Sequence, residues 1–429
     1  MRTAGLRLQD APPLAVPLSF FLTAPVAAMI AGAVLAVSGA AAVTTTWAPV
    51  TLGLTHLGTL GFLSMVMLGA LYQMLPVVAG SPVPWLRSAH AVHALLVVGA
   101  AALTWGITQG VTAAVFVAIA ALGLAFLLFV LPVARALLRA PTRDETVIGM
   151  GAAVLCLLLT AVAGTWMAHG HGGMRFPGPR TLWIQVHLCV ALLGWVGGLI
   201  IAVSWRVLPM FYLAREVAPP VKRIVQLLAT GGALLPVAVL GVDAFGLVDA
   251  ARRPLAGPAA LAALPAVLSV WFLHPAASAW SLRGRRRKRS DASLLFWRTG
   301  LVMAPLTGIA AGAAWLLPGE RWGLLFGWLA IWGWAGTIVH GMLTRIVPFL
   351  VWLHRFAPLV GEVPVPSVRT LLPEGRVRVG LALHAGSVLL GAGAILGGWD
   401  LLARVAGLAV LATACWLLGS LLHVARQRP

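Results

Sequence analysis

Twelve apolar runs, each of about 17 residues or more, follow one another along the 429-residue chain and leave only short polar connections between them. Runs of this length allow a helix to cross the hydrocarbon core of a bilayer. Because 60% of the residues are hydrophobic and only 10% are charged, water cannot be the main solvent of the chain. The sequence therefore predicts an all-α, polytopic integral membrane protein.

The predicted helices form a single transmembrane domain that covers residues 1–429. We expect them near residues 18–39, 52–78, 89–107, 113–137, 147–167, 182–211, 224–242, 259–280, 294–317, 324–352, 379–395 and 401–424. The second, sixth and tenth are longer than a bilayer requires, so they should tilt or protrude. The first run is longer than the core of a signal peptide, which favours a retained first span.

Charge is distributed unevenly over the connections, although the chain as a whole carries a net charge of +19. Six of the 30 Lys and Arg residues occupy the connections on one side, namely Arg175, Arg180, Arg252, Arg253, Arg321 and Arg404. By the positive-inside rule that side is the outer one. We therefore expect an inner-membrane protein with both termini in the cytoplasm. The basic run Arg283–Arg289 should attract anionic lipid headgroups rather than nucleic acid.

The scarcity of reactive side chains excludes several classes of function. Cys156, Cys189 and Cys415 all lie in apolar runs without a CxxC spacing, so neither a disulfide framework nor a zinc site is expected. The 11 acidic residues map to ends and connections, whereas proton-coupled transport usually needs carboxylates within the membrane. Walker, triad and Rossmann patterns are absent from the sequence.

Three of the long helices share a sequence pattern near their inner ends. The segments are Gly69-Ala-Leu-Tyr-Gln-Met-Leu-Pro76, Ala202-Val-Ser-Trp-Arg-Val-Leu-Pro209 and Gly341-Met-Leu-Thr-Arg-Ile-Val-Pro348. Each has a small residue, then Gln or Arg, then two apolar residues and proline. Since these helices are four apart in order, the pattern predicts three four-helix units, near residues 14–140, 141–282 and 290–424.

Two of these helices also carry a histidine near the outer end. His56 lies 20 residues before Pro76, and His187 lies 22 residues before Pro209. Twenty residues of helix span about 30 Å, so both imidazoles should lie near the outer interface. Neutral imidazole ligates haem iron and copper, although an interfacial histidine can equally bind water or a carbonyl. The nearest histidine of the third helix, His340, lies only 8 residues before its proline and is a further candidate cofactor ligand.

Further residues are weaker candidates for a cofactor site. His169 and His171 lie in a glycine-rich connection and could bind copper with additional ligands. The Met65 thioether could ligate iron or copper, although methionine is also ordinary core filler. Arg206 and Arg345 could bind haem propionates or extend to the cytoplasmic surface.

The segment from His56 to Pro76, with its Gly-Ala-Leu-Tyr72 sequence, resembles the second helix of the nitric oxide reductase large subunit. Together with the topology, it makes the chain similar to the haem-copper oxidase and nitric oxide reductase superfamily. The resemblance covers most of the chain in topology but only short segments in sequence. It implies haem b, with His56 as an axial ligand and His187 as a ligand of a neighbouring copper or iron site.

The chain departs from the family pattern in two helices. Residues 224–242 contain no histidine, where the family supplies two metal ligands, and residues 324–352 contain one histidine, where the family has two. These departures favour a non-pumping relative that acts in electron transfer, gas response or metal handling, with a redox partner or respiratory complex. Whether it is an enzyme stays open. The alternatives are a small-solute transporter and a cofactor-free assembly or scaffold protein.

Overall fold

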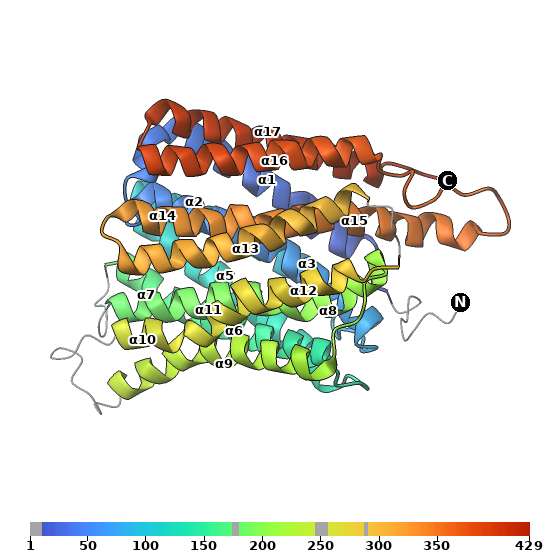
Figure 1. Cartoon of the computed structure of the whole chain (residues 1–429), viewed down its shortest axis with the longest axis horizontal. Helices are drawn as coiled ribbons and strands as arrows, with labels where there is room; N and C mark the ends of the chain where they lie inside the picture. The colour runs from blue at the N-terminus through green and yellow to red at the C-terminus, as the bar shows by residue number, and fades with distance from the viewer. Residues whose placement is uncertain (1–10, 174–179, 245–255, 287–290) are drawn as a thin grey trace. The chain divides into compact units, whose positions relative to one another are not determined.

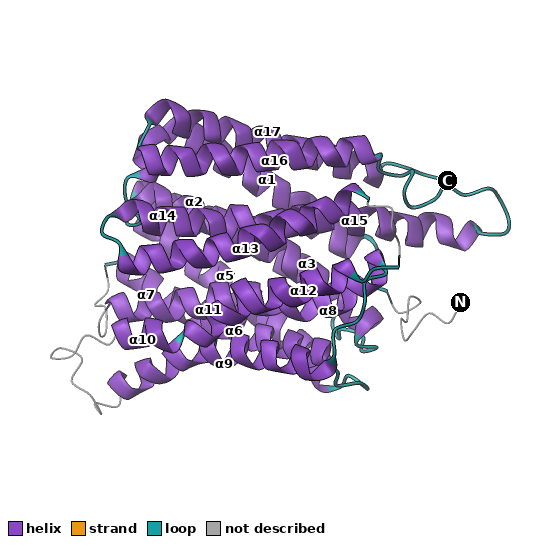
Figure 2. Cartoon of the chain, viewed as in Figure 1, coloured by secondary structure: helices purple, strands orange, loops and turns teal. Residues whose placement is uncertain are grey.

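The computed structural model describes residues 11–173, 180–244, 256–286 and 291–429. Within these ranges the chain is almost entirely helical and contains no strand, as Figure 2 shows. The predicted all-α fold is thus confirmed.

Eleven helices are long and apolar enough to cross a membrane, which confirms the multi-pass character of the described chain. They are Ala15–Val43, Pro49–Val78, Ser88–Gln109, Thr112–Leu138, Glu145–His171, Arg180–Tyr212, Pro219–Val242, Ala292–Leu316, Glu320–Leu359, Glu374–Gly397 and Asp400–Ala425. The predicted span at 259–280 is not among them: it is helical, but a turn at Ala263 separates a short helix at Ala256–Ala262 from a continuous helical stretch at 264–283. Pro265 lies in the first turn of that stretch, where proline is favoured.

The helices gather into two compact units. The central unit contains residues 74–106 and 110–288, and the terminal unit contains residues 11–73, 107–109 and 289–429. The central unit holds α4 (Ser88–Gln109), α5 (Thr112–Leu138), α6 (Glu145–His171), α7 (Arg180–Leu188), η4 (Cys189–Gly197), α8 (Gly198–Tyr212), α9 (Pro219–Ala244), α10 (Ala256–Ala262), α11 (Leu264–Leu268), η5 (Ser269–Leu273) and α12 (His274–Arg283).

The terminal unit combines the first helices of the chain with the last ones (Figure 1). It holds α1 (Ala15–Ser38), η2 (Gly39–Val43), α2 (Pro49–His56), η3 (Leu57–Ser64), most of α3 (Met65–Val78), α13 (Ala292–Leu316), α14 (Glu320–Trp328), η6 (Leu329–Gly336), α15 (Thr337–Val351), η7 (Trp352–Phe356), η8 (Ala357–Leu359), α16 (Glu374–Gly397) and α17 (Asp400–Ala425).

The three long helices with the shared sequence pattern each contain a π-helical segment. These segments are η3, η4 and η6, and they end at Ser64, Gly197 and Gly336. Each end lies twelve residues before the shared proline, at Pro76, Pro209 and Pro348 respectively. π-Helical turns are rare in proteins, and those that do occur often lie at functional sites. The three helices therefore share a backbone feature in the same register as their sequence pattern.

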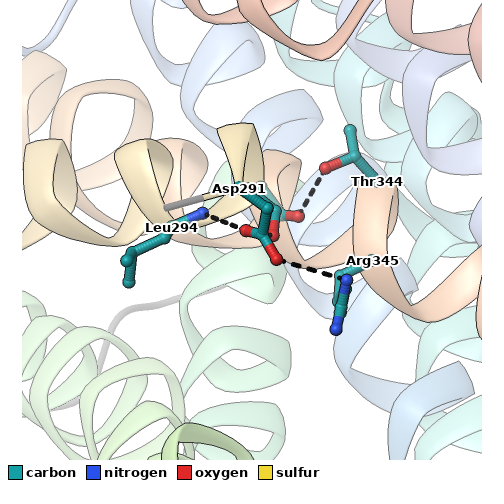
Figure 3. Close-up of polar contacts among 6 residues, drawn as sticks. Asp291, Leu294, Thr344 and Arg345 are labelled. Carbon is teal, nitrogen blue, oxygen red and sulfur yellow. Dashed lines mark hydrogen bonds and ion pairs between the residues drawn. The ribbon is translucent and has the colours of Figure 1, made fainter. Parts of the chain in front are cut away.

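The arginine of the shared pattern pairs with an aspartate that begins another helix of the same unit. In the central unit, Asp144 caps α6 by accepting a bond from Val147 N, and its other oxygen lies 3.1 Å from Arg206. In the terminal unit, Asp291 caps α13 through Leu294 N and lies 3.3 Å from Arg345 (Figure 3). Both helices thus start from an aspartate held by an arginine.

Helices α1 and α17 of the terminal unit pack with their backbones in close approach (Figure 1). A Cβ added at Gly407 would lie 2.3 Å from Ala36 N and 2.7 Å from Gly32 O, so only glycine fits there. Small residues allow helices in lipid to approach in this way. At one end of the seam, Arg404 donates to Ala36 O and Val37 O and thereby caps α1.

Candidate functional site

Two buried histidines meet in the middle of the terminal unit. His340 of α15 and His384 of α16 are 1% and 0% exposed, and their Nδ1 atoms lie 3.4 Å apart. The Phe296 ring of α13 lies 4.6 Å from the His340 ring, and the Trp332 ring of η6 lies 4.5 Å from the His384 ring. The two histidines therefore lie among aromatic side chains. Further contacts within the terminal unit hold these aromatic side chains in place.

Those further contacts tie the neighbouring helices to the pair. Phe62 of η3 contacts the far side of Trp332, with ring centroids 5.7 Å apart. The indole of Trp332 donates to Ser387 Oγ at 2.8 Å, and Ser387 donates to His384 O. Two of the π-helical segments, η3 and η6, thus lie against each other at the edge of this cluster.

Hydrogen bonding determines which nitrogen of each imidazole carries the proton. His384 Nε2 lies 3.0 Å from Trp332 O, and because a carbonyl only accepts, this nitrogen must donate. A neutral His384 therefore accepts at Nδ1, so His340 donates from its own Nδ1. Nε2 of His340 is then the unprotonated nitrogen. A histidine with its Nδ1–H fixed in this way presents a lone pair at Nε2.

The unprotonated nitrogen of His340 faces a narrow crevice between α15, α16 and α17. A Cβ added at Gly380 would lie only 3.3 Å from His340 Nε2, so the glycine keeps this side of the ring open. The residues that line the crevice are His340, Thr344, Leu372, Arg376, Val377, Gly380, Trp416, Leu417 and Ser420.

The central unit contains a third buried histidine, His274 at the start of α12. Its Nε2 lies 2.8 Å from Ser204 Oγ and 3.1 Å from Ser278 Oγ. Ser204 also donates to Ile201 O, which makes its oxygen the acceptor for His274 Nε2–H. The Trp205 ring meets the imidazole edge to face at 5.3 Å. This histidine joins α12 to α8 within the central unit.

Of the predicted ligands, His56 ends α2 directly before η3 and is partly exposed. Its Nδ1 lies 2.8 Å from Leu52 O, so the proton is on Nδ1 and Nε2 carries the lone pair. Met65 is buried nine residues further along the same helix, which is roughly 13 Å of rise, so the two cannot ligate one metal ion. Tyr72, 0% exposed, contacts Phe20 with the two rings tilted and their centroids 5.8 Å apart.

The other predicted ligands belong to the central unit. The His187 ring on α7 lies against Gly164 of α6, where a Cβ would come within 3.0 Å of its Cε1 atom. His169 bonds through Nδ1 to Thr165 O at 2.8 Å, and His171 ends the same helix. His56 lies in the terminal unit and His187 in the central unit. Among the described residues no three His, Cys, Asp or Glu side chains converge on one point.

Sequence reasoning assigned no partner to His384 and no role to His274. Both lie inside apolar runs, where a polar side chain is costly, and that position was the available signal. Searches against known protein families and against curated protein sequences found no match for this chain.

Proposed function

We propose that the protein is a haem- or copper-binding integral membrane protein related to the haem-copper oxidase superfamily, without proton pumping. It would act in electron transfer, in the response to nitric oxide or oxygen, or in metal handling. The observation that carries the proposal is the state of His56. Its Nδ1–H bond to Leu52 O fixes the tautomer that haem and copper ligands use.

We favour haem over copper as the cofactor because haem iron needs only one or two axial side chains. One imidazole with a fixed tautomer therefore meets the minimum requirement. His56 also lies at the boundary between α2 and the π-helical η3, and π-helical turns often accompany functional sites. His187, which only Leu188 separates from η4, is the second candidate ligand.

Three equivalent four-helix units are part of this proposal. The matched π-helical segments support it, since sequence pattern and backbone irregularity share one register. The paired contacts Asp144 to Arg206 and Asp291 to Arg345 support equivalence of the second and third units. Gln73 takes the place of the arginine in the first unit.

The surroundings of the protein follow from the same proposal. We place it in the inner membrane with both termini in the cytoplasm and a redox partner or respiratory complex as its neighbour. Anionic lipids would bind at Arg283–Arg289, a run that lies partly outside the described residues. Arg206 and Arg345 are the cationic side chains of the shared pattern, and a guanidinium group is suited to bind haem propionates.

A reduced-minus-oxidised absorption spectrum of the purified protein tests the cofactor directly. We expect a Soret band and an α band, and we expect His56→Ala to abolish or shift both. His90→Ala, at an exposed histidine of α4, is the matched control and should leave the spectrum unchanged. A wild-type protein that shows neither a Soret band nor copper by elemental analysis would rule the proposal out.

A further inference from the structure

The chain segments that follow α8 and α12 in the central unit are bonded to each other. α8 ends at Tyr212, and Leu213 comes next with a φ of +51°, a left-handed conformation that is uncommon for leucine. The amide of Arg215 donates to Ser281 O at 3.1 Å, and the amide of Arg286 donates to Leu213 O at 3.0 Å. Residues 213–215 and 280–286 therefore form one folded feature, which we call the basic corner.

The basic corner presents three exposed arginines. Arg215 packs across Gly284, where an added Cβ would come within 3.0 Å of the Arg215 Cβ atom. The Arg215 guanidinium group lies 4.5 Å from the centre of the Trp280 ring, a cation–π contact that orders it. Arg283 and Arg286 are exposed on either side of Gly284 in the sequence. Packing thus holds Arg215 beside the two other arginines.

These three arginines have no carboxylate partner among the described residues. Elsewhere in the described chain, ion pairs hold Arg206, Arg223, Arg345, Arg378 and Arg404 to an aspartate or glutamate. Residues 213–223 and 283–286 contain six basic residues and one acidic residue, Glu216. The basic corner is therefore strongly positive, and its arginines are available to an anion.

An exposed apolar stripe leads from the basic corner along the helical stretch at 264–283. Leu273, Ala276 and Trp280 are exposed and follow one another at intervals of three and four residues, so they lie on one face. Leu213, next to the arginines, is 51% exposed. A soluble anion would not use this stripe, whereas the acyl chains of a lipid would lie along it. Tryptophan beside cations at the end of a spanning helix is typical of the membrane interface.

We propose that the basic corner binds the headgroup of one anionic phospholipid. The phosphate accepts charge-assisted hydrogen bonds from the guanidinium groups of Arg215, Arg283 and Arg286, and the acyl chains lie along the apolar stripe. This inference deepens the proposed attraction of anionic lipids to residues 283–289 and rests on it. It replaces a diffuse attraction to a run of charge by a folded site, to which Arg215 contributes from a distant part of the sequence.

Native mass spectrometry of the purified full-length protein in neutral detergent, titrated with phosphatidylglycerol or phosphatidylcholine, tests the site. We expect one phosphatidylglycerol to bind roughly tenfold or more tightly than phosphatidylcholine. Arg215→Gln and Arg283→Gln should each weaken phosphatidylglycerol binding by about fivefold, the contribution of one arginine beside an anionic lipid. Phosphatidylcholine binding should stay unchanged, which shows that each variant is folded.

Two further variants separate position from charge. Trp280→Leu keeps the apolar stripe but removes the ring beside Arg215, so it should weaken the binding of phosphatidylglycerol alone. Arg378→Gln removes the same charge from an exposed pair on α16 and is the matched control, which should bind both lipids like the wild type. Equal weakening by Arg378→Gln would overturn the site.

The outcomes distinguish this inference from the proposals on which it builds. Equal affinity of the wild type for the two lipids would overturn both the site and the proposed attraction of anionic lipids. Weakening by Arg283→Gln but not by Arg215→Gln would overturn the folded site alone. An excess of glycerol 3-phosphate lacks acyl chains and should not displace the lipid, and displacement would overturn the assignment to a lipid. The absorption spectrum tests the haem independently of all these measurements.

Discussion

Asp291 and Arg345 lie 3.3 Å apart, and the same aspartate accepts the bond from Leu294 N that begins α13. Their side chains are 11% and 18% exposed, so the ion pair is largely shielded from water. One carboxylate thus has two separable roles, as the cap of a helix and as the partner of an arginine in α15.

Substitution of Asp291 should separate these two roles. Asn caps helices as well as Asp, so Asp291→Asn loses the ion pair alone, at a cost of about 1–2 kcal/mol. Asp291→Ala loses the cap as well and should cost about 1 kcal/mol more. Thermal unfolding in detergent measures both. Glu374→Gln, in an exposed pair with Arg378, is the control and should change stability by less than about 0.5 kcal/mol. Equal stability of the Asn and Ala variants would contradict the capping role.

Hydropathy predicted the helices of this chain well, because crossing a bilayer requires an uninterrupted apolar run. The prediction placed a span at 182–211, and the structure has a helix at Arg180–Tyr212. The exception is 259–280, where a turn at Ala263, just before Pro265, interrupts the helix although composition stays apolar. A window average does not register where a proline restarts a helix.

The π-helical segments and the histidine pair could not be predicted in this way. A π-helical turn depends on a shifted hydrogen-bond register, which leaves no fixed residue signature in η3, η4 or η6. The sequence places His340 twelve residues nearer its proline than His56, and in the structure the partner of His340 is His384 of α16. Nothing in the sequence reveals which helix faces fit together when two residues are 44 positions apart. Pairing across helices is decided by packing rather than by sequence spacing.

The seam between α1 and α17 should be sensitive to a single methyl group. Gly407→Ala would place a Cβ within 2.3 Å of Ala36 N, so the backbones must separate, at a cost of about 1–3 kcal/mol. Gly419→Ala lies on the same helix with nothing within 4 Å of its Cβ position. This control should be stabilising by about 0.5–1 kcal/mol, since alanine favours helix. Unfolding in detergent compares the two, and a loss of stability in both would argue against the specific contact.

The His340 to His384 contact should appear as an energetic coupling. Each single Phe substitution leaves one buried nitrogen without its partner, which costs about 1–3 kcal/mol. In the double Phe variant both polar groups are gone, so its loss of stability should be smaller than the sum by about 1 kcal/mol. Nitrogen NMR of the wild type provides a second readout. It should show protons on His340 Nδ1 and His384 Nε2, and additive stabilities would contradict the pairing.

His274 of the central unit offers a similar test with two alternative acceptors. In Ser204→Ala, Ser278 Oγ remains 3.1 Å from His274 Nε2, so stability should fall by less than about 1 kcal/mol. Ser278→Ala should be equally mild, because Ser204 Oγ remains at 2.8 Å. The double variant leaves a buried N–H without either hydroxyl and should cost about 1–3 kcal/mol more than the sum of the single variants. Simple additivity in thermal unfolding would show that the two serines do not share this histidine, and the interpretation of α12 as hydrogen-bonded to α8 would fail.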